Sequence, residues 1–193
     1  MIPVYLDDLQ LPQVFEAYTD MVDRYLLETM VDKHIVDSET NRICGFVTDV
    51  FGQNEEIAGE YFSVENPTES SYALLQIDHG IIKSSDLKKC DCAIANNTSL
   101  CFIEFKAKAY SSLLSTIEKN YKNAIEQLNA TIGLFDSHHA SQGTDIRTLR
   151  SIEAYICFRQ GYPRNTSTQM NYQVAFAAAN KGIPLLFARN KKL

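Results

Sequence analysis

Residues 89–108 read KCDCAIANNTSLCFIEFKAK, and this stretch decides the fold class that the sequence predicts. Residues 89–95 and 100–108 are rich in apolar and β-branched side chains, which is typical of strands. Asn96 and Asn97, which lie between them, are common turn residues. We therefore expect an antiparallel β-hairpin here.

The segments outside the hairpin alternate between helical and strand-like patterns. Apolar residues at three-to-four spacing predict helices, whereas short apolar runs bounded by turn residues predict strands. The polar stretch 137–143 is predicted to be a loop, and His79-Gly80 a turn. Helices are expected at 14–31, 49–61, 113–135 and 169–180, and strands at 71–78, 152–158 and 183–188. This order predicts a single α/β domain over residues 1–193, with a mixed central β-sheet flanked by helices.

Two charged residues interrupt the second strand of the hairpin. Strand alternation places Glu104 and Lys106 on one face, and Ile103 and Phe105 on the other. A charge inside a sheet is costly, so both charges should be paired, bound to a metal or at an edge. Asp91 interrupts the first strand in the same way. Two carboxylates on adjacent strands beside a lysine are suited to holding a divalent cation and a phosphate together.

Asp91, followed after twelve residues by Glu104-Phe105-Lys106, resembles the motif of the PD-(D/E)xK nuclease superfamily, which has the restriction-endonuclease-like fold. The resemblance covers roughly residues 55–160, and the helix after the motif carries Gln127, similar to the glutamine of many members. It implies a nuclease-like α/β core over residues 61–193, with residues 1–60 as an acidic helical N-terminal extension.

The resemblance also implies a function and a set of site residues. Asp91 and Glu104 would bind Mg²⁺, for which Mn²⁺ can substitute, and Lys106 would position or activate the attacking water. Gln127 would be an auxiliary polar residue. The implied activity is that of a metal-dependent endonuclease acting on DNA.

The sequence departs from the family pattern at two places. Cys90 stands where the family has a proline before the aspartate. Many members also have a glutamate on the helix before the first strand, and here the candidates are Glu60 first and Glu56 second.

Further residues are candidates for supporting roles. Asp78, in the Asp-His-Gly turn, is a candidate acid or base at the same edge, although this motif is also ordinary turn chemistry. Lys88, Lys89 and Lys108 are candidates for contacts with DNA phosphates, although Lys108 is equally suited to a solvated strand end. A homodimer is expected, because two cuts on antiparallel strands suit two-fold symmetry.

The charge is unevenly distributed along the chain. The net charge of −6 argues against a protein that coats nucleic acid with its whole surface. Residues 1–60 carry a net −10, however, and residues 61–193 a net +4. The acidic N-terminal segment is either a solvated face or a docking surface for a basic protein partner.

Two alternatives to the nuclease hypothesis stay open. Glu104 and Lys106 would also suit a salt bridge on a solvated sheet face, in a globular α/β protein unrelated to nucleases. The chain would equally suit a non-catalytic protein of the same fold that binds a protein partner, as an inhibitor or an assembly subunit.

The composition indicates a cytoplasmic protein without a membrane span. No apolar run approaches the roughly 18 residues that a transmembrane helix needs, and the first ten residues lack a basic signal-peptide region. The five cysteines are an odd number without zinc-site spacing, which suits a reducing compartment.

Overall fold

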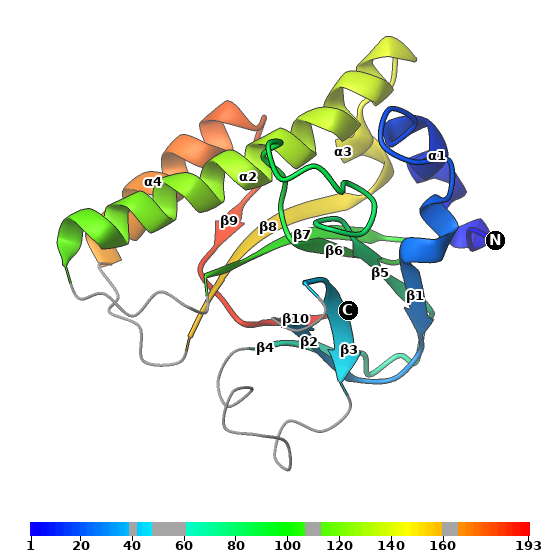
Figure 1. Ribbon diagram of the computed structural model, residues 1–193, viewed down its shortest axis with the longest axis horizontal. Coiled ribbons are helices and arrows are strands. Elements are labelled where there is room, and N and C mark those ends of the chain that lie inside the picture. The colour runs from blue at the N-terminus through cyan, green and yellow to red at the C-terminus, as the bar shows by residue number, and fades with distance from the viewer. Residues whose placement is uncertain (39–41, 48–60, 107–112, 160–165) are drawn as a thin grey trace.

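The computed structural model describes residues 1–38, 42–47, 61–106, 113–159 and 166–193 (Figure 1). It confirms the mixed α/β class, with two mixed β-sheets and several helices. No helix in these ranges combines the length and hydropathy needed to cross a membrane.

The α-helices are α1 (Leu11–Val14), α2 (Leu114–Ser141), α3 (Ile146–Leu149) and α4 (Thr166–Ala179), and 3-10 helices cover Val4–Leu9 and Val22–Tyr25. The strands are β1 (Leu26–Thr29), β2 (Lys33–Asp37), β3 (Cys44–Val47), β4 (Tyr61–Glu65), β5 (Tyr72–Gln76), β6 (Cys92–Ala95), β7 (Ser99–Lys106), β8 (Ser151–Phe158), β9 (Leu185–Leu186) and β10 (Asn190–Lys192).

The larger sheet has six strands in the order β1-β5-β6-β7-β8-β9. Neighbours from β1 to β7 are antiparallel, whereas β7, β8 and β9 run parallel to one another. Parallel neighbours need a crossover connection, and here α2 connects β7 to β8 while α4 connects β8 to β9. The predicted hairpin is confirmed, with Cys92 opposite Ile103 and Ala95 opposite Leu100.

Helices α2 and α4 cover one face of this sheet (Figure 1). The side chains of α2 that face the sheet recur every three or four residues and are buried, which is the pattern of an amphipathic helix. They are Ile117, Tyr121, Ala124, Leu128, Thr131, Ile132 and Phe135. The N-terminal residues join the same core, and Phe15 packs edge-on against Phe135 with ring centroids 5.5 Å apart.

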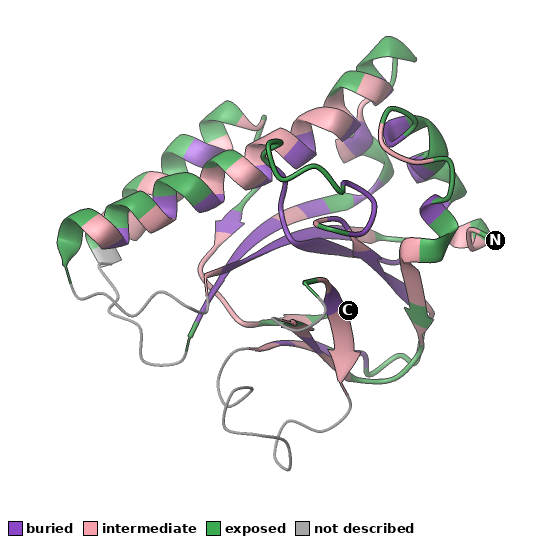
Figure 2. Cartoon of the chain, in the orientation of Figure 1, coloured by how far each residue is buried: buried purple, intermediate pink, exposed green. Residues whose placement is uncertain are grey.

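The opposite face of the six-stranded sheet is covered by a four-stranded sheet in the order β10-β4-β2-β3 (Figures 1 and 2). A second hydrophobic core lies between the two sheets and includes Ile35, Phe62, Ile94, Ile103 and Phe105. Strand β7 is therefore buried on both faces, as Figure 2 shows. Any charge on β7 is consequently buried as well, unless it lies at the end of the strand.

A tight turn follows β5 and lies next to the motif strands. Gly80 is required there, because a Cβ atom at this position would lie 2.2 Å from the carbonyl oxygen of Gln76. His79 adopts a left-handed conformation with φ of 57°, and the amide of Ile81 donates to the same Gln76 carbonyl at 3.0 Å. The predicted turn at His79-Gly80 is confirmed.

The prediction of a helix over residues 14–31 is wrong, and so is that of a helical N-terminal extension. Helix α1 ends at Val14, and residues 26–29 form β1, which pairs with β5 in the larger sheet. The apolar residues that suggested a helix are buried by several short segments instead, with Val14, Phe15 and Val22 all in the main core. Strands β2 and β3 also come from residues 1–60, so this region belongs to both sheets.

Two other boundaries differ from the sequence prediction. Helix α2 continues through Ser141, so most of the predicted loop over 137–143 is helical. His139 is buried in this part of the helix, and its Nδ1 is 3.3 Å from the Thr144 hydroxyl. The last predicted strand is shorter than expected, since β9 covers only Leu185–Leu186. The predicted helix over 49–61 lies outside the described residues except for Tyr61, which begins β4.

Candidate functional site

Asp91 lies one residue before β6 and is held by its neighbours on both sides. Continuing the hairpin register places it opposite Glu104. Its Oδ2 accepts a hydrogen bond from the amide of Phe105 at 2.5 Å. Its carbonyl oxygen accepts from the amides of Ile77 and Asp78 at 3.1 and 3.0 Å. The end of β5 and the end of β7 thus fix the position of this aspartate.

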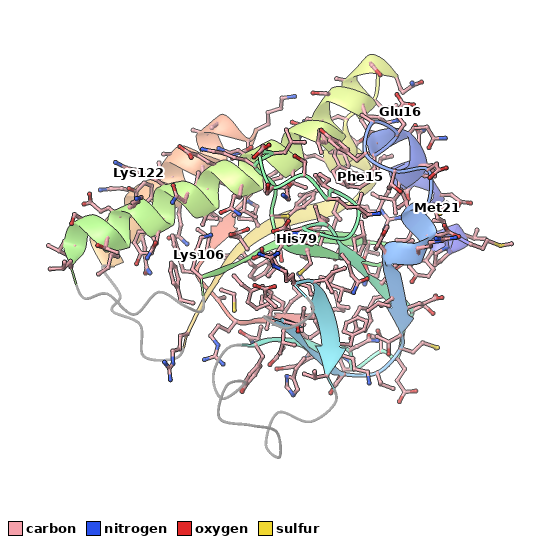
Figure 3. All side chains as sticks on the ribbon, viewed as in Figure 1. Phe15, Glu16, Met21, His79, Lys106 and Lys122 are labelled. Carbon is pink, nitrogen blue, oxygen red and sulfur yellow. The ribbon has the colours of Figure 1, made fainter. Side chains whose placement is uncertain are left out.

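Glu104 and Lys106 share one face of β7, as strand alternation predicted, and that face points toward α2, while Ile103 and Phe105 join the core between the sheets. The Lys106 ammonium donates to Glu104 Oε1 and, at 2.8 Å, to Gln127 Oε1. Figure 3 shows Lys106 on the sheet side of α2. These bonds join three of the four predicted catalytic residues, Glu104, Lys106 and Gln127, in one hydrogen-bonded network.

The amide of Gln127 links this network to the segment before β6. Its Nε2 donates to the carbonyl oxygen of Lys89 at 3.1 Å. One turn further along α2, Thr131 Oγ1 accepts from the amide of Cys90 at 2.8 Å. Two polar residues of α2 therefore anchor the residues immediately before Asp91. Thr131 was missed by the sequence analysis, and its only signal is a hydroxyl at position i+4 from Gln127 in an otherwise apolar stripe.

Burial dominates the electrostatics of both carboxylates. Glu104 is only 1% exposed, and its Oε2 has no hydrogen-bond partner among the residues that the structure describes. Burial, followed by the negative charge of Asp91, raises the pKa of Glu104 well above its ordinary value, although the Lys106 ammonium opposes this. A salt bridge on a solvated sheet face, the simplest alternative from the sequence, is therefore wrong.

Burial also raises the pKa of Asp91 from 3.8 to about 7. The next cause is the negative charge of Asp37, whereas the Phe105 amide and Lys106 lower this pKa. Asp37 lies at the end of β2 and pairs with Cys44 in the four-stranded sheet. It was missed by the sequence analysis, because nothing in the sequence indicates that a residue 54 positions away approaches Asp91.

The predicted supporting residues have different surroundings. Asp78 lies beside the site, and its negative charge raises the pKa of both Asp91 and Glu104. Lys89 is only 5% exposed and forms an ion pair with Asp78 at 3.0 Å, so its ammonium stabilises the turn instead of facing solvent as a phosphate contact would require. Lys88 is exposed and pairs with Glu126 on α2. Lys108, Glu60 and Glu56 lie outside the described residues.

A polar pocket of about 450 Å³ opens beside this network. Its wall includes Lys106 and one face of α2, with Asn120, Asn123 and Gln127 at helical spacing. Its other side is formed by residues 85–89 and Asp78. Lys106 thus separates the pocket from the buried carboxylate of Glu104.

The donor set at this site fits a hard divalent cation. In the described part of the chain, no group of three or more His, Cys, Asp or Glu side chains is placed to hold a metal ion. Mg²⁺ is usually bound by one or two carboxylates and keeps several waters or substrate phosphates as its other ligands. Asp91 and Glu104 supply two carboxylates, and the Oε2 of Glu104, which no described residue contacts by a hydrogen bond, is an oxygen available for a ligand.

Comparisons with protein-family models, with curated proteins and with solved structures found no match for this chain. What the site does must therefore be inferred from its own side chains. These are two buried carboxylates, a lysine shared between one of them and a glutamine, and an adjoining polar pocket.

Proposed function

We propose that this protein is a metal-dependent endonuclease that hydrolyses phosphodiester bonds in DNA. The observation that carries the proposal is the burial of Asp91 and Glu104 opposite each other, with Lys106 bonded to Glu104 at the wall of a polar pocket. Buried carboxylates with strongly raised pKa values beside a cleft are typical of functional sites.

The chain topology supports the same proposal. Three antiparallel strands, β5, β6 and β7, are followed by α2 and by β8 parallel to β7. This order, with Asp91 before the second strand and Glu104 on the third, is the one that the resemblance to PD-(D/E)xK nucleases implies. Where the family pattern has a helix before the first strand, β4 comes directly before β5 among the described residues.

Each residue has a distinct role in this proposal. Asp91 and Glu104 would hold Mg²⁺, or Mn²⁺ in its place. A bound ion of this kind lowers the pKa of an attacking water and stabilises the charge that develops on the phosphate. Lys106 positions the water, and Gln127 orients Lys106 through the 2.8 Å hydrogen bond to its ammonium.

The test is cleavage of supercoiled plasmid, linear duplex DNA and single-stranded DNA in Mg²⁺ or Mn²⁺. We expect Asp91→Asn, Glu104→Gln and Lys106→Met each to lower the cleavage rate by about 100-fold or more. Lys192→Met is the matched control, because Lys192 is exposed on β10 in the other sheet. Cleavage that survives the three site substitutions would refute the site assignment.

A second candidate function is a non-catalytic protein of this fold that binds a protein partner. It is favoured by one observation: the Lys106 ammonium already pairs with Glu104, as in a structural ion pair. The acidic N-terminal region would supply the docking surface for a basic partner, although it is not the helical extension expected from the sequence. Absence of cleavage on every DNA form in both metals would favour this candidate.

A further inference from the structure

The charges that line the pocket beside Lys106 balance, since three lysines face the carboxylates of Asp78, Asp86 and Glu126. Each of its three lysines is paired with a carboxylate: Lys88 with Glu126, Lys89 with Asp78 and Lys106 with Glu104. A pocket built to hold a phosphate by charge alone would keep unpaired cations facing its opening. The chemistry that this pocket offers a ligand is therefore largely neutral.

An apolar side chain and an amide side chain are prominent in the pocket wall. Leu87 is 44% exposed, and it lines the pocket together with Asn123, which is exposed on α2. A nucleobase matches this pair, because its faces are apolar and its edge carries hydrogen-bond donors and acceptors. Asn side chains can make two hydrogen bonds to such an edge.

The size of the pocket limits the form of the ligand. Its volume of about 450 Å³ lies in the range of roughly 300–1,000 Å³ that is typical of small-molecule sites. Such a pocket cannot admit a base pair within a stacked duplex, because a base enters a pocket only after it leaves the stack.

We propose that this pocket receives one unstacked nucleotide of single-stranded DNA, with its base against Leu87 and Asn123 and its phosphate toward Lys106. The inference rests on the proposed nuclease function and specifies its substrate, as a single strand or an unpaired strand end. The 2.8 Å bond between Lys106 and Gln127 ties the pocket wall to the site, so a nucleotide in the pocket would lie next to Lys106, which separates it from Glu104.

The test is binding without catalysis, measured by fluorescence anisotropy in EDTA. The probes are a fluorescein-labelled single-stranded DNA 12-mer of mixed sequence and the blunt duplex of the same sequence. We compare the wild type with Asn123→Ala and Leu87→Ala. The matched controls are Asn171→Ala and Leu149→Ala, which alter exposed residues on α4 and α3 that do not line the pocket.

We expect the wild type to bind the single strand more tightly than the duplex. Each pocket substitution should weaken single-strand binding by about fivefold, the effect of one lost hydrogen bond or apolar contact, whereas the controls bind as the wild type does. Equal affinity for the duplex, or single-strand binding unaffected by both pocket substitutions, would overturn the inference. Since no hydrolysis is needed, this result is separate from the cleavage assay: absence of cleavage by the wild type on every DNA form refutes the nuclease proposal, whereas single-strand binding that the pocket substitutions leave unchanged refutes the nucleotide pocket.

Discussion

Replacing Asp91 with asparagine should stabilise the folded protein above neutral pH. The pKa of this carboxyl is about 7 in the folded protein against an ordinary value of 3.8, and burial is the main cause. At about 1.4 kcal/mol per pH unit, this difference corresponds to about 4 kcal/mol of unfavourable free energy when the folded protein carries the ionised carboxylate. The asparagine side chain has a similar shape but no charge, and its oxygen can still accept from the Phe105 amide.

The sign of the pH dependence follows from the raised pKa. Below about pH 4, Asp91 is protonated in both the folded and the unfolded protein, so it does not penalise folding. Between pH 4 and 7 the unfolded protein releases this proton first, and stability falls. Above pH 7 the full penalty is present. The stability gained by Asp91→Asn should therefore be near zero at pH 4 and approach about 4 kcal/mol at pH 8.

Urea unfolding followed by circular dichroism measures this difference at a series of pH values. Comparing the two proteins at each pH cancels the contributions of the other titrating groups. The reasoning is refuted if Asp91→Asn is less stable than the wild type at pH 8, or if the difference does not change with pH. A second readout is Mg²⁺, which should stabilise the wild type at pH 8 and have a much smaller effect on the variant, since a ligand stabilises only the state that binds it.

Two further predictions concern the framework of the site. Gly80→Ala should lower the free energy of unfolding by about 3 kcal/mol, because the added Cβ would clash with the Gln76 carbonyl oxygen. Gly133→Ala should raise the free energy of unfolding by about 0.5–1 kcal/mol, because the added Cβ would lie in open space on α2 and alanine favours a helix. Equal shifts in the thermal midpoints of the two variants would contradict this. Arg150→Met should cost about 2 kcal/mol and increase amide exchange over residues 4–14, because the buried guanidinium holds Asp8 near the N-terminus. Unchanged exchange in that segment would show that the ion pair does not anchor it.

The motif region was predictable because its signals are local. The alternation of Ile103, Glu104 and Phe105 determines which side chains share a face, and the adjacent asparagines at 96 and 97 determine where the hairpin turns. Gln127 was predicted from the resemblance to the nuclease motif, and in the structure its Oε1 accepts from the Lys106 ammonium at 2.8 Å. The apolar stripe of α2 likewise follows from helical spacing alone.

The N-terminal region was not predictable in the same way. Apolar residues that recur every three to four positions over 14–31 fit a helix. The same pattern fits equally well a series of short segments that each bury one or two side chains. Residues 26–29 form a strand because the edge of β5 provides hydrogen-bond partners for their backbone. An isolated segment cannot reveal such a partner, because strand pairing depends on residues far away in the sequence.

The sequence by itself therefore determined the hairpin, the long helix that crosses over it and the shared face of Glu104 and Lys106. Only the tertiary structure decided that these charges are buried, since that requires the second sheet to cover β7 from the other side. It also decided that Asp37 approaches Asp91 and that Lys89 pairs with Asp78 and does not face solvent. The physical reason is that alternation and periodicity are properties of neighbouring residues, whereas burial and the resulting pKa values depend on everything that surrounds a side chain.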